Sequence, residues 1–308
     1  MKSEPAYLAL HRQGALAERA RLAGESLECC DLCPRSCRAD RRATSRGIGC
    51  HTGAHARVAS HFPHLGEERC LSGRRGSGTL FFSFCNLRCV FCQNWEISWQ
   101  GEGREVSCDE LAAMMLELQE LGCHNINLVT PSHVVAPILG SLELAAGEGL
   151  RLPLVYNSGG YDSLKALALL DGVVDIYMPD IKYGSSEVAT RYSQAPGYVE
   201  VSQAAVREMH RQVGDLVLDD EGLARRGLLV RHLVLPNHLA GTEQVLRFLA
   251  EQISRDTWLN LMDQYRPCFS AREIPELARP ITSQELHEAL GLAAKWGLHR
   301  LDPASLCT

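Results

Sequence analysis

The sequence has no run of about 18 apolar residues, the length that a helix needs to cross a membrane. Charged side chains interrupt every apolar patch in the first 20 residues, so the sequence does not favour a signal peptide either. A nucleotide phosphate loop is also missing, because the glycine-rich stretch 73–78 lacks a Lys-Ser/Thr ending and precedes an expected strand rather than a helix. We therefore expect a cytoplasmic protein without a membrane segment.

The composition is that of a folded protein. Of its 308 residues, 45% are hydrophobic and 22% are charged, which suits one large core or two unequal domains. The 13 cysteines are odd in number and concentrated in the first third of the chain. This distribution favours metal binding in a reducing compartment over a disulfide framework.

Charge is divided unevenly along the chain. Residues 1–75 carry 13 Lys and Arg against 8 Asp and Glu, whereas the whole protein has a net charge of −6. Aromatic residues do not alternate with these basic residues, so we expect no nucleic-acid binding. A solvated basic face is the simplest interpretation, and docking of an acidic electron donor such as a flavodoxin or ferredoxin is the functional alternative.

Three cysteines, Cys85, Cys89 and Cys92, lie on one short stretch, CNLRCVFC, directly after an apolar run. Thiolates at this C-x3-C-x2-C spacing can converge on a single iron–sulfur cluster. A cluster of four irons held by three thiolates leaves one iron open, and an open position is where a substrate or cofactor binds. The alternative, a structural zinc site, needs four ligands, and no further Cys or His follows at the usual spacing.

The cysteine loop resembles that of the radical S-adenosylmethionine (SAM) superfamily. The longer stretch FFSFCNLRCVFCQNWEIS resembles its pyruvate formate-lyase activating enzyme-like branch. The resemblance implies that Cys85, Cys89 and Cys92 bind a 4Fe-4S cluster whose open iron is chelated by SAM, and that Phe91 borders the adenine. It also implies reductive cleavage of SAM to a 5'-deoxyadenosyl radical that abstracts hydrogen from a substrate. The protein would seat the cluster, orient SAM and exclude water and oxygen.

A second group of cysteines precedes this loop. Cys30, Cys33, Cys37 and Cys50 supply four thiolates, enough for a tetrahedral zinc site or for a second iron–sulfur cluster. Proline and glycine residues among them predict loops with little core of their own, which a metal would hold together. Proteins of the resembled branch carry a similar pattern that ends in GxGxC, as here. We expect a metal site, with iron and zinc both open.

From residue 78 onward, short apolar strands alternate with amphipathic helices, which is typical of a parallel sheet built from βα units. We predict strands at 79–84, 125–129, 152–156, 173–178, 228–235 and 258–262, and helices at 6–23, 164–170, 199–213 and 242–253, with further helices beginning at capping boxes at Ser107 and Thr282. Six such units indicate an α/β fold, a partial (β/α)6 TIM-type barrel, which the resemblance also implies. We divide the chain into a cysteine-rich metal-binding segment (1–75), the barrel (76–268) and a helical extension (269–308).

Polar residues follow each predicted strand, at the edge of the sheet where reacting groups collect. We predict that they line a pocket for SAM. Seven are candidate contacts: Thr130, Ser132, Asn157, Ser158, Asp180, Lys182 and Arg231. Related enzymes hold the SAM amine with a Gly-Gly-Glu stretch, which is missing here, so an oxygen of Thr130 or Ser132 would replace it.

The other candidates suit different parts of SAM. Asn157 and Ser158 suit the ribose or the carboxylate. Asp180 and Lys182 resemble a D-x-K element of the branch. Arg231 suits a bidentate contact with the SAM carboxylate.

The sequence thus predicts a radical SAM enzyme. The resemblance to activating enzymes implies hydrogen abstraction from a glycine backbone of a partner glycyl radical enzyme, and a small molecule or another peptide is the alternative substrate. Two other classes stay open: a non-catalytic iron–sulfur redox carrier and a zinc-stapled binding module. A carrier has no need of a three-cysteine loop beside a polar pocket, and this feature separates it from an enzyme.

Overall fold

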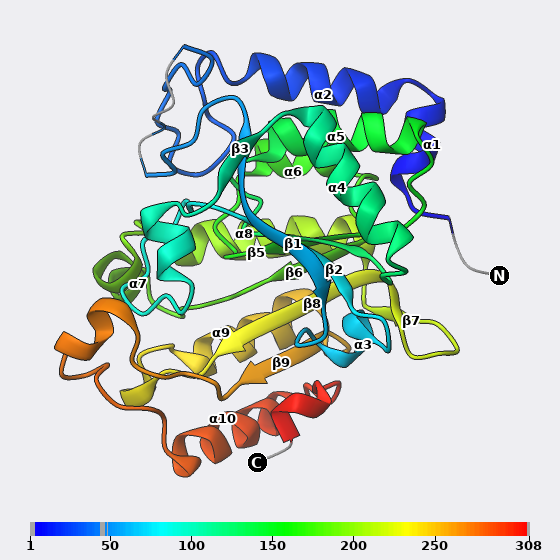
Figure 1. The fold of residues 1–308 in the computed structure, drawn as a ribbon. Coiled ribbons are helices and arrows are strands. Elements are labelled where there is room, and N and C mark those ends of the chain that lie inside the picture. The colour runs from blue at the N-terminus through cyan, green and yellow to red at the C-terminus, as the bar shows by residue number, and fades with distance from the viewer. Residues whose placement is uncertain (1–3, 44–46, 48, 307–308) are drawn as a thin grey trace.

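The structure, a computed structural model, describes residues 4–43, 47 and 49–306 (Figure 1). In this part of the chain, nine strands form a sheet in the order β3-β1-β2-β4-β5-β6-β8-β7, and β9 pairs with β8. The strands are β1 (Ala56–His64), β2 (Ser77–Phe82), β3 (Arg104–Val106), β4 (Ile126–Val129), β5 (Leu154–Ser158), β6 (Ile176–Pro179), β7 (Val217–Leu218), β8 (Ala224–Leu233) and β9 (Trp258–Met262).

Helices cover the sheet and its ends. The α-helices are α1 (Tyr7–Arg12), α2 (Ala15–Glu25), α3 (Arg69–Ser72), α4 (Cys108–Glu120), α5 (Val135–Gly147), α6 (Leu164–Leu170), α7 (Ser186–Ser193), α8 (Tyr198–Val213), α9 (Thr242–Phe248) and α10 (Ser283–Trp296). Short π- or 3₁₀-helical segments are η1 (Glu96–Gln100), η2 (Pro236–His238), η3 (Leu249–Ile253), η4 (Phe269–Glu273) and η5 (Pro303–Leu306). None of the described helices combines the length and the apolar character that a membrane crossing requires.

The six predicted strands are present, and all six are parallel. They form the series β2-β4-β5-β6-β8-β9. The series is open, because the outer neighbour of β2 is the antiparallel strand β1, while β9 lies at the other end beside β8. The protein therefore has an α/β fold with a mostly parallel, open sheet.

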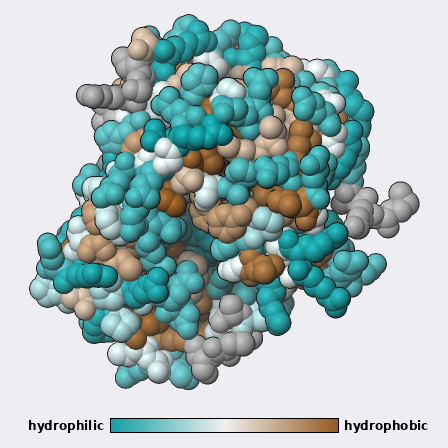
Figure 2. Space-filling view, in the orientation of Figure 1, coloured by the Kyte–Doolittle hydropathy of each residue, from teal (hydrophilic) through white to brown (hydrophobic). Residues whose placement is uncertain are grey.

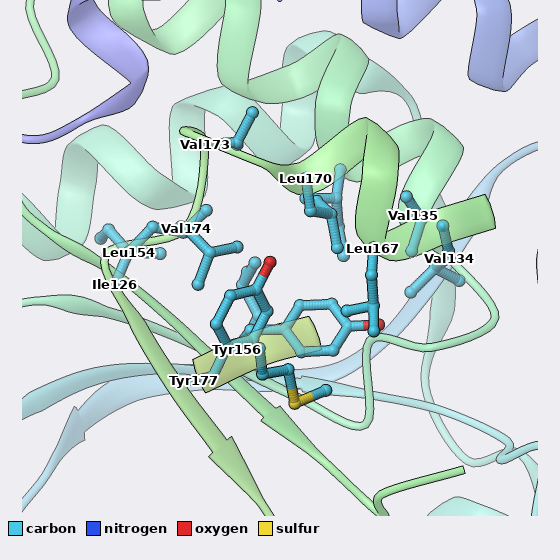
Figure 3. Close-up of a cluster of buried hydrophobic side chains, with 14 of the residues drawn as sticks. Ile126, Val134, Val135, Leu154, Tyr156, Leu167, Leu170, Val173, Val174 and Tyr177 are labelled. Atoms are coloured by element: carbon cyan, nitrogen blue, oxygen red, sulfur yellow. The ribbon is translucent and has the colours of Figure 1, made fainter. Parts of the chain in front are cut away.

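The main core lies between this sheet and the helices that cover it, and Figure 3 shows the part of it that involves α5 and α6. Leu154 and Tyr156 on β5 are fully buried and meet Leu167 and Leu170 of α6 in the same cluster. The rings of Tyr156 and Tyr177 pack edge to face at 5.7 Å. Each such aliphatic side chain contributes about 1.5–3 kcal/mol on burial, so the core fixes the strand ends that carry the polar residues.

Two predicted helix starts are confirmed in atomic detail. The Ser107 hydroxyl accepts from the Glu110 N–H, and the Glu110 carboxylate accepts from the Ser107 N–H at 2.8 Å. Thr282 and Glu285 form the same reciprocal pair at the start of α10. Both boxes satisfy backbone donors that a helix leaves without internal partners.

Several elements differ from the prediction. The single helix expected at 6–23 is two helices, because Gly14 between them has a φ of +72°. Helix α5 was not predicted, since its sequence is apolar on nearly every side and lacks an amphipathic period. Strand β1 was not predicted either, because Ser, His and Pro interrupt its alternation.

The segment before β2 packs against the rest of the protein. The Ala6 N–H donates to Asp175 Oδ1 at 2.9 Å, and the Tyr7 hydroxyl donates to the Leu152 carbonyl at 3.0 Å. Helix α2 lies along α5, as Figure 1 shows. The division at residues 75 and 268 stays a prediction, and residues 1–3, 44–46, 48, 307 and 308 of its outer parts lie outside the described residues.

Two further segments, the one after α10 and the one around α3, pack against the parallel strands. The segment after α10 runs along β9, where the Leu259 N–H donates to the Arg300 carbonyl at 3.0 Å. Helix α3 and Glu68, the residue before it, contact the sheet both beside β4 and on β9, that is, near the two ends of the open parallel series. The Leu71 carbonyl accepts from Asn125 Nδ2 beside β4 at 2.9 Å, and Glu68 Oε1 accepts from Asn260 Nδ2 on β9 at 2.9 Å.

Candidate functional site

A cavity of about 400 Å³ lies at the sheet, and residues from all six parallel strands or their ends line it. The face drawn in Figure 2 mixes hydrophilic and hydrophobic residues and has a recess near its middle. Ten of the predicted site residues line the cavity: Cys85, Cys89, Phe91, Cys92, Thr130, Asn157, Ser158, Asp180, Lys182 and Arg231. The structure thus brings together residues that are far apart in the sequence.

The cysteine loop leaves β2 through a strained turn. Phe84 has a φ of +64°, which a bulky residue rarely adopts, and its ring packs on Gly101. A Cβ atom on Gly101 would lie 2.2 Å from that ring, so only glycine fits at this position. The turn aims the following cysteines into the cavity.

Each of the three sulfurs accepts a hydrogen bond from the surrounding protein. The Leu87 N–H donates to Cys85 Sγ at 3.3 Å, and the Ser98 hydroxyl donates to Cys92 Sγ at 3.1 Å. The buried Ser193 hydroxyl donates to Cys89 Sγ at 2.9 Å. Donors of this kind stabilise thiolate charge and set the potential of iron–sulfur clusters. The loop therefore fits a thiolate-bound cluster.

Burial keeps the thiols of Cys85 and Cys89 neutral when no metal is bound. It raises the pKa of Cys85 to about 12, with the neighbouring Cys89 and Cys92 adding to the effect. It also raises the pKa of Cys89 to about 11, although the nearby Lys182 ammonium opposes the rise. Binding a cluster must release these protons, and Lys182 favours the thiolates that result.

A charged network lies beneath the loop. Asp180 accepts from Lys182 Nζ at 2.6 Å and from Arg231 Nε at 2.7 Å, and Arg231 Nη2 donates to Asn157 Oδ1 at 2.7 Å. Arg231 Nη1 faces Glu67 at 3.8 Å. Two guanidinium nitrogens of Arg231 are therefore already hydrogen-bonded to protein side chains. These two nitrogens are not free for the bidentate contact that was predicted with the SAM carboxylate.

Of the two predicted amine contacts, the structure places only Thr130 on the cavity. Ser132 is not among the described residues that line it, and its hydroxyl hydrogen-bonds with the buried Asp162. Ser158 lines the cavity, but its hydroxyl also donates to Asp162, at 2.6 Å. Thr130 has a φ of +64°, an unusual conformation for a β-branched residue and one found preferentially at functional sites.

Residues 79–219 match the family model of the radical SAM superfamily. The chain belongs to the radical SAM superfamily. It is 33% identical over 278 residues to the uncharacterized protein MJ0674 of Methanocaldococcus jannaschii, covering 87% of this chain and 75% of the relative. It is also similar to the crystal structure of a radical SAM methyltransferase from Sphaerobacter thermophilus, with a TM-score of 0.45 and 13% identity over 74% of this chain and 67% of the other.

The sequence analysis missed two acidic residues of this site, Glu67 and Glu68. Glu67 comes after β1 and lines the cavity together with His64, the last residue of β1, and His64 Nδ1 lies 3.0 Å from Glu67 Oε1. Glu68 is 7% exposed, and burial raises its pKa. The paired carboxylates of GEER were the only signal, and they lie in a segment that was assigned to a separate amino-terminal unit.

The amino-terminal cysteines also gather in one place. Burial raises the pKa of Cys33 to about 12, and Cys50, Cys30 and Cys37 each add to the rise, so the four thiols lie within electrostatic reach of one another. Cys30, Cys33 and Cys50 are buried and Cys37 is half-buried. Within the described residues, neither this set nor the three-cysteine loop converges closely enough to hold a single metal ion.

Proposed function

We propose that this protein is an enzyme that binds a 4Fe-4S cluster through Cys85, Cys89 and Cys92 and binds SAM in the adjoining cavity. When bound, the cluster and SAM supply a 5'-deoxyadenosyl radical for hydrogen abstraction. The observation that carries the proposal is the set of three hydrogen-bonded thiols on one cavity wall. Membership of the radical SAM superfamily supports it.

In this proposal, residues of the chain itself bind SAM and orient it beside the cluster. Phe91 is 5% exposed and packs edge to face on Tyr183 at 6.3 Å and on Tyr265 at 5.9 Å, which gives the adenine a rigid apolar wall. Lys182 keeps positive charge beside Cys89. Thr130 and Asn157 offer oxygen atoms at neighbouring strand ends for the amine and the ribose.

A later segment shields the cluster loop from solvent. The Ala271 N–H donates to the Val90 carbonyl at 3.0 Å, and the Phe269 ring stacks on Trp95 at 5.3 Å with an interplanar angle of 10°. Trp99 also packs on Phe269 and donates to the Cys89 carbonyl at 3.2 Å. Radical chemistry requires this exclusion of water and oxygen.

A narrower proposal concerns the hydrogen donor. The resemblance of residues 81–98 to activating enzymes suggests a glycine backbone in a glycyl radical enzyme, and a flavodoxin or ferredoxin would then supply the electron. A small molecule or another peptide is the alternative. Incubation with deuterium-labelled candidates decides between them, because deuterium appears in 5'-deoxyadenosine only with the true donor.

The main test is SAM cleavage by the anaerobically reconstituted protein in dithionite. We expect the wild type to form 5'-deoxyadenosine and Cys89→Ala to form none. Cys108→Ala is the matched control, because Cys108 is half-buried at the start of α4, outside the cavity, and should keep the wild-type rate. A wild type that binds SAM but forms no product would favour the redox carrier.

A further inference from the structure

The turn after β5, residues 158–162, contacts both parts of the site. Its first two residues line the cavity. On its other side, Asn86 Nδ2 donates to the Tyr161 carbonyl at 2.6 Å, and a Cβ atom on Gly159 would lie 2.7 Å from Leu87 Cδ1. Asn86 and Leu87 belong to the cysteine loop. The turn therefore joins the wall of the cavity to the cysteine loop.

A buried carboxylate fixes this turn. Asp162 is 3% exposed, its Oδ1 accepts from the Tyr156 hydroxyl at 2.9 Å, and its Oδ2 accepts from the Ser158 hydroxyl at 2.6 Å. The Ser158 oxygen in turn accepts from the Gly160 N–H at 3.2 Å. A carboxylate suits this place because it only accepts hydrogen bonds, so both hydroxyls donate to it and the Ser158 oxygen is left to accept from the backbone.

The backbone of the turn has little room to move. Gly160 has a φ of +72°, and a Cβ atom on it would lie 2.3 Å from the Asp180 carbonyl oxygen, so glycine is required on both counts. The Tyr198 hydroxyl lies 2.9 Å from the carbonyl oxygens of both Gly159 and Asp180. The turn is therefore held in one conformation from several sides.

The strand end that carries the turn also holds its two neighbours. The Thr130 N–H at the end of β4 donates to the Asn157 carbonyl at 2.8 Å, and the Asp180 N–H after β6 donates to the Ser158 carbonyl at 2.9 Å. All four of these residues line the cavity. A shift of the turn would therefore displace the polar groups of three strand ends together.

Asp162 acts on the site through other residues. It is not among the described residues that line the cavity, and burial of a carboxylate is costly unless hydrogen bonds compensate it. Outer partners of this kind orient the groups that bind, and replacing them lowers affinity about 10- to 100-fold in metal sites.

We propose that Asp162 is a positioning residue, which holds the SAM-binding ends of β4, β5 and β6 in place against the cysteine loop. The inference rests on the proposed function, in which the cavity binds SAM beside the cluster. It adds that one turn aligns the two binding sites, so that loosening the turn weakens the binding of both SAM and the cluster.

The variant Asp162→Asn tests the SAM side of the turn. The amide nitrogen cannot accept, so one of the two hydroxyls loses its acceptor. In anaerobic equilibrium dialysis of the reconstituted protein, we expect the dissociation constant for SAM to rise about tenfold. Equal SAM affinity in the wild type and Asp162→Asn would overturn the proposal.

Asp175→Asn is the matched control. Asp175 is likewise buried, at 5% exposed, and accepts two hydrogen bonds, from the N–H groups of Ala6 and Leu154 at 2.9 Å each. It lies directly before β6 and outside the cavity. We expect this variant to lose stability and to keep the wild-type affinity for SAM, whereas equal weakening in both variants would show a merely structural role for Asp162.

Iron release to a chelator, measured without SAM, tests the cluster side of the turn. Asp162→Asn should release iron about tenfold faster than Asp175→Asn when each is measured at the same interval below its own unfolding temperature. Equal rates would overturn the coupling between the turn and the cysteine loop.

If Asp162→Asn does not fold, Ser158→Ala takes its place, because it keeps the hydrogen bond from Tyr156 to Asp162 in the core. Iron release without SAM does not depend on any direct contact between Ser158 and SAM, so an unchanged rate in this variant would overturn the proposal. A wild type that binds neither cluster nor SAM would refute the proposed function instead. Wild-type binding of both, with unchanged variants, refutes only the role of Asp162.

Discussion

Replacing Asp180 by Asn should leave two buried cations without their shared counter-charge. Asp180 Oδ1 accepts from Arg231 at 2.7 Å, and Oδ2 accepts from Lys182 at 2.6 Å. The three side chains are between 13% and 17% exposed. We therefore expect Asp180→Asn to lower the free energy of unfolding.

The size of this loss in unfolding free energy depends on the partners that Arg231 and Lys182 keep in the variant. Removing one member of a buried ion pair costs about 3–5 kcal/mol. Arg231 keeps its hydrogen bond to Asn157, and the network keeps some contact with solvent. We therefore expect a loss of about 3 kcal/mol, at the low end of that range.

Urea unfolding at pH 7 measures this loss. Glu243→Gln is the matched control, because it breaks the half-exposed pair between Glu243 and Lys295, whose charged atoms are 2.7 Å apart. Such surface pairs contribute about 0–1 kcal/mol. If Asp180→Asn cost no more than this control, the network would not hold the strand ends together as the structure indicates.

The loss should also depend on pH. Burial alone would raise the pKa of Asp180, but Arg231 and Lys182 outweigh it and hold the pKa below its usual value. A lowered pKa in the folded state stabilises the protein above the unfolded-state pKa of about 4, and this stabilisation disappears as the pH falls through the folded-state pKa. The difference between wild type and Asp180→Asn should therefore shrink below about pH 4, and a constant difference would contradict the assignment.

Three further predictions concern single residues. Ser193→Ala removes the hydrogen bond to Cys89 Sγ and should lower the cluster midpoint potential by about 40 mV, from a bond of about 1 kcal/mol; an unchanged titration would contradict it. Ser107→Ala removes the cap of α4 and should lower the free energy of unfolding in urea by about 1 kcal/mol. An unchanged free energy of unfolding would show that the cap does not stabilise the helix. Thr130→Gly should relieve the left-handed strain and raise thermal stability by about 1 kcal/mol, whereas a loss would show that Thr130 is unstrained.

Much of the fold was predictable because its signals are local. The strands of a parallel sheet are buried on both faces and appear as short apolar runs, as in 125–129 and 258–262. Capping boxes at Ser107 and Thr282 are likewise local patterns. The carboxyl ends of parallel strands meet at one edge, so most of the predicted polar residues do line one cavity.

What was not predictable depends on contacts between distant segments. The sequence shows that Arg231 ends a strand, but not that Asp180 and Asn157 already occupy its nitrogens. Ser132 follows Thr130 by two residues, yet after the strand ends the alternation of faces no longer holds, and its hydroxyl meets Asp162. Glu67 reaches the cavity only because α3 closes the open side of the sheet.

The central claim, an iron left open by three thiolates, is tested most directly by Mössbauer spectroscopy of the protein reconstituted with ⁵⁷Fe. The account predicts that SAM changes the spectrum of one iron in the cluster held by Cys85, Cys89 and Cys92, and leaves the other three unchanged. A spectrum in which SAM changes no iron, because protein ligands hold all four, would contradict it.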